Sequence, residues 1–166
     1  MKQLKPDVLI TFAFTENGLA NYTLAEKSIE FARFNNLPMF TQEDISKKIE
    51  CTSVKILNNH DQLYIRESDS YLSTLGLIHG LKKVAEERNW NNVVVAAAPV
   101  HCWRCVRDLR KMGFHVLGCL NVGIRTNKYW FNDNDPQIWV RNSLFWYIRE
   151  SILRLLPWRV YSKIAG

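Results

Sequence analysis

The stretch that decides the fold is Asn91–Arg104, NNVVVAAAPVHCWR. Within it Val93–Val100 is apolar throughout, as expected of a strand that is covered on both faces of a parallel sheet. A helix is predicted directly afterwards, over His101–Met112, and Gly113 ends it because glycine readily adopts the left-handed conformation that follows many helices. A buried strand that leads into a helix is the repeating unit of an α/β domain.

The same alternation extends in both directions from this stretch. Strands are predicted at Asp7–Phe14, Pro38–Thr41, Gln62–Arg66, Asn91–Ala98 and Phe114–Cys119. Helices are predicted at Thr23–Asn35, Thr41–Cys51, Ser70–Asn89, His101–Met112 and Pro136–Leu156. Thr23 and Glu26 have the spacing of a capping box, which indicates a helix start at Thr23. The order predicts one Rossmann-like, doubly wound α/β domain over residues 1–166, three layers deep, with a mainly parallel sheet of about five strands.

Composition excludes several classes of protein. Of the 166 residues 47% are hydrophobic and 23% are charged, which is ordinary for a globular domain and excludes a disordered chain. No apolar run approaches the length of about 20 residues that a membrane-spanning helix needs. The apolar stretch Val8–Phe14 is short for a secretory signal, and four cysteines do not require an oxidising compartment. We therefore expect a cytoplasmic protein, with a membrane-peripheral position as an option.

The positive charge is concentrated in the second half of the chain. Residues 1–82 hold 9 Lys/Arg and 10 Asp/Glu, whereas residues 83–166 hold 13 and 6, a balance of +7. Such a surface attracts phosphates, anionic lipid or a small anionic molecule, and an ordinary solvated surface is an equally good interpretation. No dense Lys/Arg run is present, so no nucleic-acid partner is expected.

A ligand site is expected where the strands end. In doubly wound folds ligands lie beyond the carboxyl ends of the strands, where helix N-termini present free N–H groups. The segments predicted there are Thr15–Asn17, Thr41–Glu43, Glu67–Ser70, Ala98–Arg104 and Cys119–Asn121. His101 and Arg104 are three residues apart and share a helix face, so together they form a candidate clamp for an anion. The alternative is that His101 caps the helix and Arg104 pairs with a surface carboxylate.

Cys102 and Cys105 form a C-x-x-C motif at the start of the same helix. This motif is typical of thiol redox sites, in which the helix N-terminus lowers the thiol pKa. Zinc would require two further ligands, and no second C-x-x-C accompanies the motif. A third interpretation is structural, with Cys105 in the core and Cys102 partly exposed.

The last predicted helix carries an apolar stripe of Leu144, Ile148, Ile152 and Leu155. Such a stripe most often packs on the sheet, and this leaves Trp146, Tyr147 and Leu153 outside it. Beyond the helix, aromatic residues alternate with basic ones. Residues 154–163 are accordingly a candidate contact for an anionic membrane surface, with an ordinary end of the fold as the alternative.

Several well-known motifs are absent. The chain has no G-x-G-x-x-G, no G-x-x-x-x-G-K-[ST], no G-x-S-x-G and no H-E-x-x-H. These absences argue against dinucleotide dehydrogenases, P-loop NTPases, nucleophile-elbow hydrolases and zincins.

Two motifs of this chain occur in a characteristic order. The sequence has Glu67-x-x-Ser70-x-x-Ser73, then a predicted helix, then a predicted strand followed by His101-x-x-Arg104. This order and spacing resemble the YdcF/SanA/ElyC group of bacterial proteins. In the last helix the pair Arg149-Glu150 is similar to an Arg-Glu pair of the family. The likeness covers about residues 62–156.

The chain also departs from the family pattern. Thr15 and Glu16 follow the first strand where the family has a glycine turn, Thr41-Gln42-Glu43 stands for Ser-Gly-Gly, Ser73 stands for threonine and Gly76 for asparagine. Alanines replace the Thr-Ser that precedes the family histidine. Only part of the family's ligand pocket is therefore matched.

The resemblance implies a doubly wound fold and a role near the bacterial envelope. It implies a small-molecule site at the strand ends, with S-adenosylmethionine or a phosphorylated envelope precursor as candidate ligands. The candidate ligand-binding residues are Thr15, Glu16, Glu67, Ser70, Ser73, His101 and Arg104. The alternatives are a non-catalytic interaction or membrane-peripheral domain and a thiol redox protein that uses Cys102 and Cys105. No catalytic residue is assigned and no metal is expected.

Overall fold

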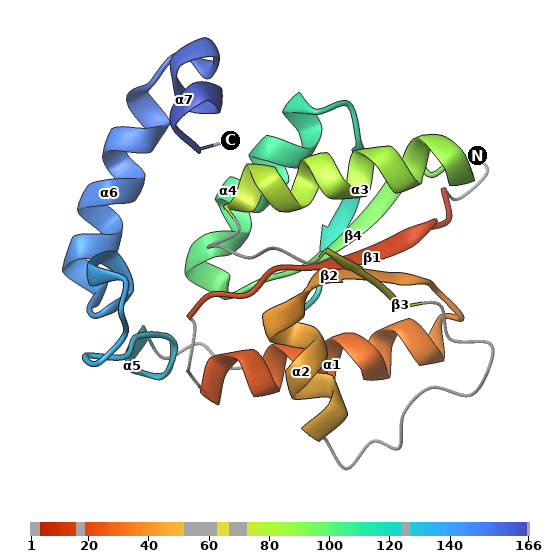
Figure 1. The fold of residues 1–166 in the computed structure, drawn as a ribbon, viewed down its shortest axis with the longest axis horizontal. Helices are drawn as coiled ribbons and strands as arrows, with labels where there is room; N and C mark the ends of the chain where they lie inside the picture. Colours follow the sequence, from red (N-terminus) through yellow and green to blue (C-terminus); the bar gives the residue numbers. More distant parts are fainter. Residues whose placement is uncertain (1–3, 16–18, 52–62, 67–72, 124–126, 166) are drawn as a thin grey trace.

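A computed structural model describes residues 4–15, 19–51, 63–66, 73–123 and 127–165. Within these ranges five parallel strands form one sheet in the order β3-β2-β1-β4-β5 (Figure 1). They are β1 (Val8–Thr11), β2 (Met39–Gln42), β3 (Leu63–Arg66), β4 (Asn92–Ala96) and β5 (His115–Cys119). The predicted doubly wound α/β fold is confirmed.

Helices cover both faces of this sheet. In Figure 1, α1 (Leu19–Phe34) and α2 (Glu43–Cys51) lie below it, and α3 (Thr74–Arg88) and α4 (Pro99–Lys111) lie above it. The chain continues through the short α5 (Asn127–Trp130) and the 3-10 turn η1 (Ile138–Val140) to α6 (Ser143–Leu155) and α7 (Trp158–Ala165). α6 runs alongside the layers at the left of the view, and α7 returns toward α3.

The core consists of two apolar clusters, one on each side of the sheet. Successive residues of a strand point to opposite faces. Val8 and Ile10 of β1 accordingly join the cluster beneath α3 and α4, whereas Leu9 joins the cluster over α1 and α2. Val8–Thr11 pairs with β2 on one side and β4 on the other, so its backbone groups are satisfied within the sheet. β1 and β4 are therefore central, as their apolar sequences predict.

The first helix begins earlier than predicted. α1 begins at Leu19, so Thr23 lies inside the helix and the predicted capping box is wrong. The Thr23 hydroxyl instead forms a hydrogen bond with the Tyr129 hydroxyl, at 2.7 Å. The extra turn also brings Asn21 under β1, where it is fully buried. At the end of α4, by contrast, Gly113 has φ +97°, which confirms its predicted role.

The predicted helix Pro136–Leu156 is divided in the structure. η1 ends before Asn142, whose side chain accepts a 3.0 Å hydrogen bond from the backbone N–H of Phe145 and caps α6. Pro157 separates α6 from α7, because proline cannot continue the hydrogen-bonding pattern of a helix.

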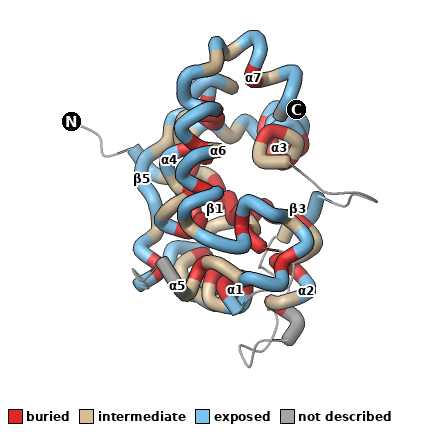
Figure 2. Tube along the Cα trace, turned by 90° about the vertical axis from the view of Figure 1, so that its left-hand side faces the viewer, coloured by how far each residue is buried: buried red, intermediate tan, exposed pale blue. Residues whose placement is uncertain are grey.

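The apolar stripe of α6 faces away from the protein, so its predicted packing on the sheet is wrong. Leu144, Ile148, Ile152 and Leu155 are 65%, 50%, 56% and 85% exposed. The residues of α6 that are buried are Trp146, Glu150 and Leu153. In Figure 2, α6 lies on the side nearest the viewer and is coloured mainly as exposed. Specific partners of Trp146 and Glu150, described below, determine this orientation.

In the part of the chain that the structure describes, no helix is both long and apolar enough to cross a membrane.

Candidate functional site

A small polar cavity lies at the carboxyl edge of the sheet, beside the N-terminus of α4. The polar residues that line it are Thr15, Gln42, Asp44, Thr74, His101, Arg104 and Gln137, and the apolar ones include Phe12, Phe14 and Trp146. Its volume is about 30 Å³, room for about one water molecule or one polar group of a ligand. The position next to β1 and β4 is where the strand order changes direction, the usual place for a ligand in this class of fold.

Side chains hold the backbone that follows β1 in place at the cavity. The buried Asn21 amide accepts a 3.0 Å hydrogen bond from the N–H of Phe14 and donates one to the carbonyl of Thr15. Gln42 accepts a 3.4 Å hydrogen bond from the N–H of Ala13. The segment that presents Thr15 is thus fixed from both α1 and β2, which favours a preformed site.

His101 is enclosed by aromatic rings. It is 3% exposed, and the rings of Phe12, Phe14 and Trp146 lie 6.2, 6.1 and 5.4 Å from its own. Burial lowers the pKa of His101 well below its ordinary value, and the positive charges of Arg104 and Arg149 lower it further. The imidazole is therefore neutral at physiological pH.

The contacts of His101 also determine its tautomer. Arg104 Nη2 lies 3.2 Å from His101 Nδ1, and a guanidinium can only donate, so Nδ1 is the acceptor. The proton of the neutral ring is then on Nε2, which lies 3.3 Å from the Thr74 hydroxyl oxygen. Nε2 donates to that oxygen, and the hydroxyl hydrogen of Thr74 is directed elsewhere.

Arg104 connects this ring to α6. Its Nη1 lies 2.7 Å from Glu150 Oε1, and both side chains are 5% exposed. Burial raises the pKa of Glu150, although Arg104 opposes the rise by favouring the carboxylate. The guanidinium also lies 5.2 Å from the Trp146 ring centre. Arg104 therefore pairs with a carboxylate, as the alternative interpretation expected, but this carboxylate is buried rather than on the surface.

One donor in the cluster remains without an acceptor. Arg104 Nε is buried and has no hydrogen-bond partner among the described residues. Buried N–H groups in native proteins nearly always have a partner, which can be water, an ion or a ligand. The first turn of α4 adds little to this, because Pro99 has no N–H and the N–H groups of His101 and Cys102 already donate to the carbonyl of Ala98. The Nε–H of Arg104 suits an electron-rich ligand atom.

Among the residues that the structure describes, no three His, Cys, Asp or Glu side chains lie close enough together to hold a metal ion.

Of the sequence-predicted site residues, Thr15, His101 and Arg104 line the cavity. Ser73 is the N-cap of α3 instead, where its hydroxyl accepts a 2.9 Å hydrogen bond from the N–H of Gly76. Glu16, Glu67 and Ser70 lie outside the described residues.

The structure adds residues to the site that sequence reasoning missed. They are Asp44, Thr74, Gln137 and Trp146, which line the cavity, and Glu150, which pairs with Arg104. Gln42 lines the cavity as well, and it lies in the segment Thr41–Glu43 that is predicted at this edge. Glu150 is the one acid of residues 141–166. A single carboxylate in such a basic segment could have indicated an ion pair with a buried cation. For Gln137 and Trp146 no local pattern was available.

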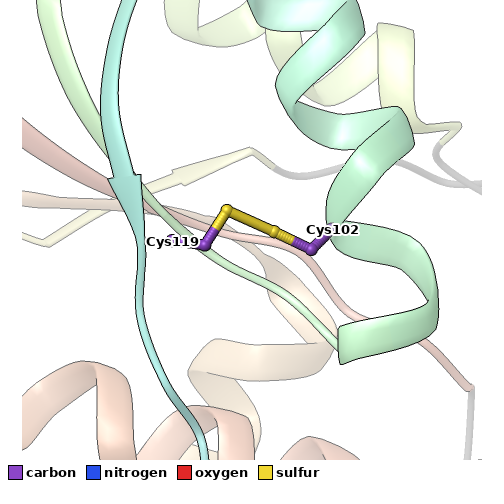
Figure 3. Close-up of a disulfide and its surroundings, with 2 residues drawn as sticks. All are labelled: Cys102 and Cys119. Carbon is purple, nitrogen blue, oxygen red and sulfur yellow. A yellow bond between two sulfur atoms is a disulfide. The ribbon is translucent and has the colours of Figure 1, made fainter.

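The cysteines do not form the pair that a thiol redox site would use. Cys102 on α4 forms a disulfide with Cys119 at the end of β5, and not with Cys105 as the redox alternative would require (Figure 3). Cys105 is fully buried in the core while Cys102 is partly exposed, which confirms the structural interpretation of their positions. Burial raises the pKa of the Cys105 thiol, the opposite of what a reactive thiol needs. A cross-link over 17 residues stabilises the fold by about 3 kcal/mol in the chain-entropy description.

No known protein family matches this chain, and no curated protein or solved structure matches it either. The resemblance to the YdcF/SanA/ElyC group remains a prediction from the residues quoted above.

Proposed function

We propose that this chain is a small-molecule-binding domain of the YdcF/SanA type, with its ligand at the carboxyl edge of the sheet. An anionic or nucleotide-like ligand, such as S-adenosylmethionine or a phosphorylated envelope precursor, would place one polar group in the cavity. The rest of such a ligand would extend out of it, because the cavity is small. Thr15, Thr74 and Arg104 are the residues that would contact that group, and His101 would position Thr74.

The observation that carries this proposal is the buried Arg104 Nε that lacks an acceptor. A ligand oxygen in the cavity would accept a hydrogen bond from it. His101 would act as a fixed neutral donor to Thr74, and Thr74 would donate to the ligand. Glu150 neutralises Arg104, so the proposed contact depends on directed hydrogen bonds more than on net charge.

Arg104→Lys is the sharpest test. Lysine keeps a positive charge near Glu150 but lacks the Nε–H, whereas Arg104→Ala would remove the shorter of the two ion pairs of the buried Glu150 and disturb the fold. Calorimetric titration would use three probes: inorganic phosphate, AMP and S-adenosylmethionine. We expect one of them to bind, and Arg104→Lys to weaken it by about 10-fold or more, as loss of a charged hydrogen bond of about 1.5–3 kcal/mol requires.

His115→Gln is the matched control, since His115 is exposed on β5 and should leave binding unchanged. Equal affinity of Arg104→Lys and the unmodified protein would show that Nε does not contact the ligand. Absence of binding by all three probes would contradict the ligand class proposed.

The proposed location is cytoplasmic and membrane-peripheral, and the disulfide offers a test of it. Reducing cytoplasm keeps most thiols free, so Cys102 and Cys119 should be alkylated when cells are lysed directly into an alkylating reagent. Protection of both thiols under these conditions would indicate an oxidising compartment instead.

A further inference from the structure

An apolar surface follows the outer side of α6 and continues onto η1. It consists of the α6 stripe, defined as Leu144, Phe145, Ile148, Ile152 and Leu155, together with Ile138 and Trp139. All of these side chains are at least 36% exposed. Between η1 and α6 the surface forms a groove of about 370 Å³. Large exposed patches of this kind mark contacts with another molecule or a membrane.

Basic residues flank this surface. An α-helix turns by about 100° per residue, which places Arg149 on one side of the α6 stripe and Arg154 on the other. α7 adds Arg159 and Lys163, both exposed. The one acid of residues 141–166, Glu150, is buried and pairs with both Arg104 and Arg149, so it contributes no exposed negative charge. The surface is therefore apolar at its centre and cationic at its margins.

We infer that the α6 stripe docks on an anionic lipid bilayer. An interfacial helix buries its apolar face at the boundary of the acyl chains, while its flanking Arg and Lys side chains extend to the phosphates. Each basic residue near an anionic surface adds attraction that salt screens. A second copy of this chain is a poorer occupant, since its own surface carries the same positive charges and the two would repel.

The contact lies along α6 rather than over residues 154–163 as the sequence predicted. Tyr161 is 1% exposed and belongs to the core cluster, and Trp158 packs against that cluster. The Tyr161 hydroxyl donates to Asp108 on α4, which holds α7 against the domain. Of the predicted segment, its basic side chains, Leu155 and Val160 remain exposed.

The experiment is flotation of the whole chain with vesicles of phosphatidylcholine and phosphatidylglycerol, and with vesicles of phosphatidylcholine alone. We expect binding to the anionic vesicles at about 0.1 M salt and loss of most binding at about 1 M, because the screening length falls from about 10 Å to about 3 Å. Ile148→Ser/Ile152→Ser should weaken binding by about tenfold or more at unchanged net charge. Arg154→Gln/Arg159→Gln/Lys163→Gln should remove the preference for the anionic vesicles.

Leu4→Ser/Phe34→Ser is the matched control, since both residues are exposed and lie far from α6 in sequence, at the chain start and the end of α1. It should bind like the unmodified protein, and melting temperatures would verify that every variant is folded.

Three outcomes overturn the inference. The first is no binding to the anionic vesicles at low salt, and the second is full binding by the isoleucine variant. The third is a dimer in sedimentation analysis that the isoleucine variant dissociates, which would assign the surface to self-association. None of these results depends on the ligand site.

Discussion

The two faces of α6 differ in a way that its sequence does not reveal. The inner face places Trp146, Glu150 and Leu153 against α4 and the cavity, although one of these residues is an acid. The outer face holds most of the aliphatic side chains of the helix and leaves them exposed. A helix thus buries the face that has specific partners, even when its other face is more apolar.

Those partners are few and well defined. Trp146 Nε1 donates a 3.3 Å hydrogen bond to the carbonyl of Val100, and the indole packs on Phe14 with ring centres 4.7 Å apart. Glu150 meets the otherwise uncompensated charge of Arg104. Arg107 on α4 donates at 3.3 Å to the carbonyl of Leu153, one turn further along. Together they hold the inner face of α6 against α4.

The largest expected difference between the faces is at two adjacent aromatic residues. Trp146→Ala should lower the free energy of unfolding by about 5 kcal/mol, near the upper end for a buried aromatic, because a hydrogen bond and the stacking on Arg104 are lost as well. Phe145→Ala, on the half-exposed side, should cost about 1 kcal/mol or less. Urea denaturation measures both, and equal losses would mean that the two faces are buried alike.

Removing the inner-face acid should have the next largest effect. Glu150→Ala leaves the Arg104 guanidinium buried without its carboxylate, and we expect a loss of about 3–4 kcal/mol. The double variant Arg104→Met/Glu150→Leu removes both charges and should recover most of that stability in the same assay. If the double variant is as unstable as the single one, packing rather than the ion pair explains the effect.

The pH dependence of stability should report on His101 of α4, whose ring packs on Trp146 at the inner face of α6. The pKa of His101 is lowered in the folded state, so below its ordinary value of 6.5 the unfolded chain takes up a proton that the folded chain does not. Stability is therefore lost as the pH falls through 6.5, at up to about 1.4 kcal/mol per pH unit. Denaturation at pH values on both sides of 6.5 should show this slope in the unmodified protein and its loss in His101→Gln. If stability depends on pH in the same way in the unmodified protein and in His101→Gln, then His101 titrates alike in the folded and the unfolded state.

The smallest effect is expected on the outer face. Ile152→Ser should change the free energy of unfolding by about 0.5 kcal/mol or less, since the side chain is 56% exposed. Its neighbour Leu153 is 9% exposed, and Leu153→Ser should cost several times more. A large loss from Ile152→Ser would indicate that α6 packs through its apolar stripe after all.

Much of the fold could be predicted from local pattern. Val93–Ala98 is apolar throughout, which favours a strand buried on both faces, and β4 is indeed a central strand. His101 and Arg104 could be placed at the site because the chain after a parallel strand always emerges at the same edge of the sheet. The start of α1 was missed because Asn21 is held there by contacts with the segment after β1, and the capping box at Thr23 was a competing local signal.

The sequence by itself determined the alternation of strands and helices, the parallel sheet and the edge at which His101 and Arg104 lie, because each depends on residues that are close together in the chain. Only the tertiary structure decided that Cys102 pairs with Cys119, that Glu150 pairs with Arg104 and that the apolar stripe of α6 faces outward. These features depend on residues 17 to 46 positions apart, or on which of two faces finds a partner. Periodicity along one helix specifies that two faces differ, but the elements packed against that helix select the one that is buried.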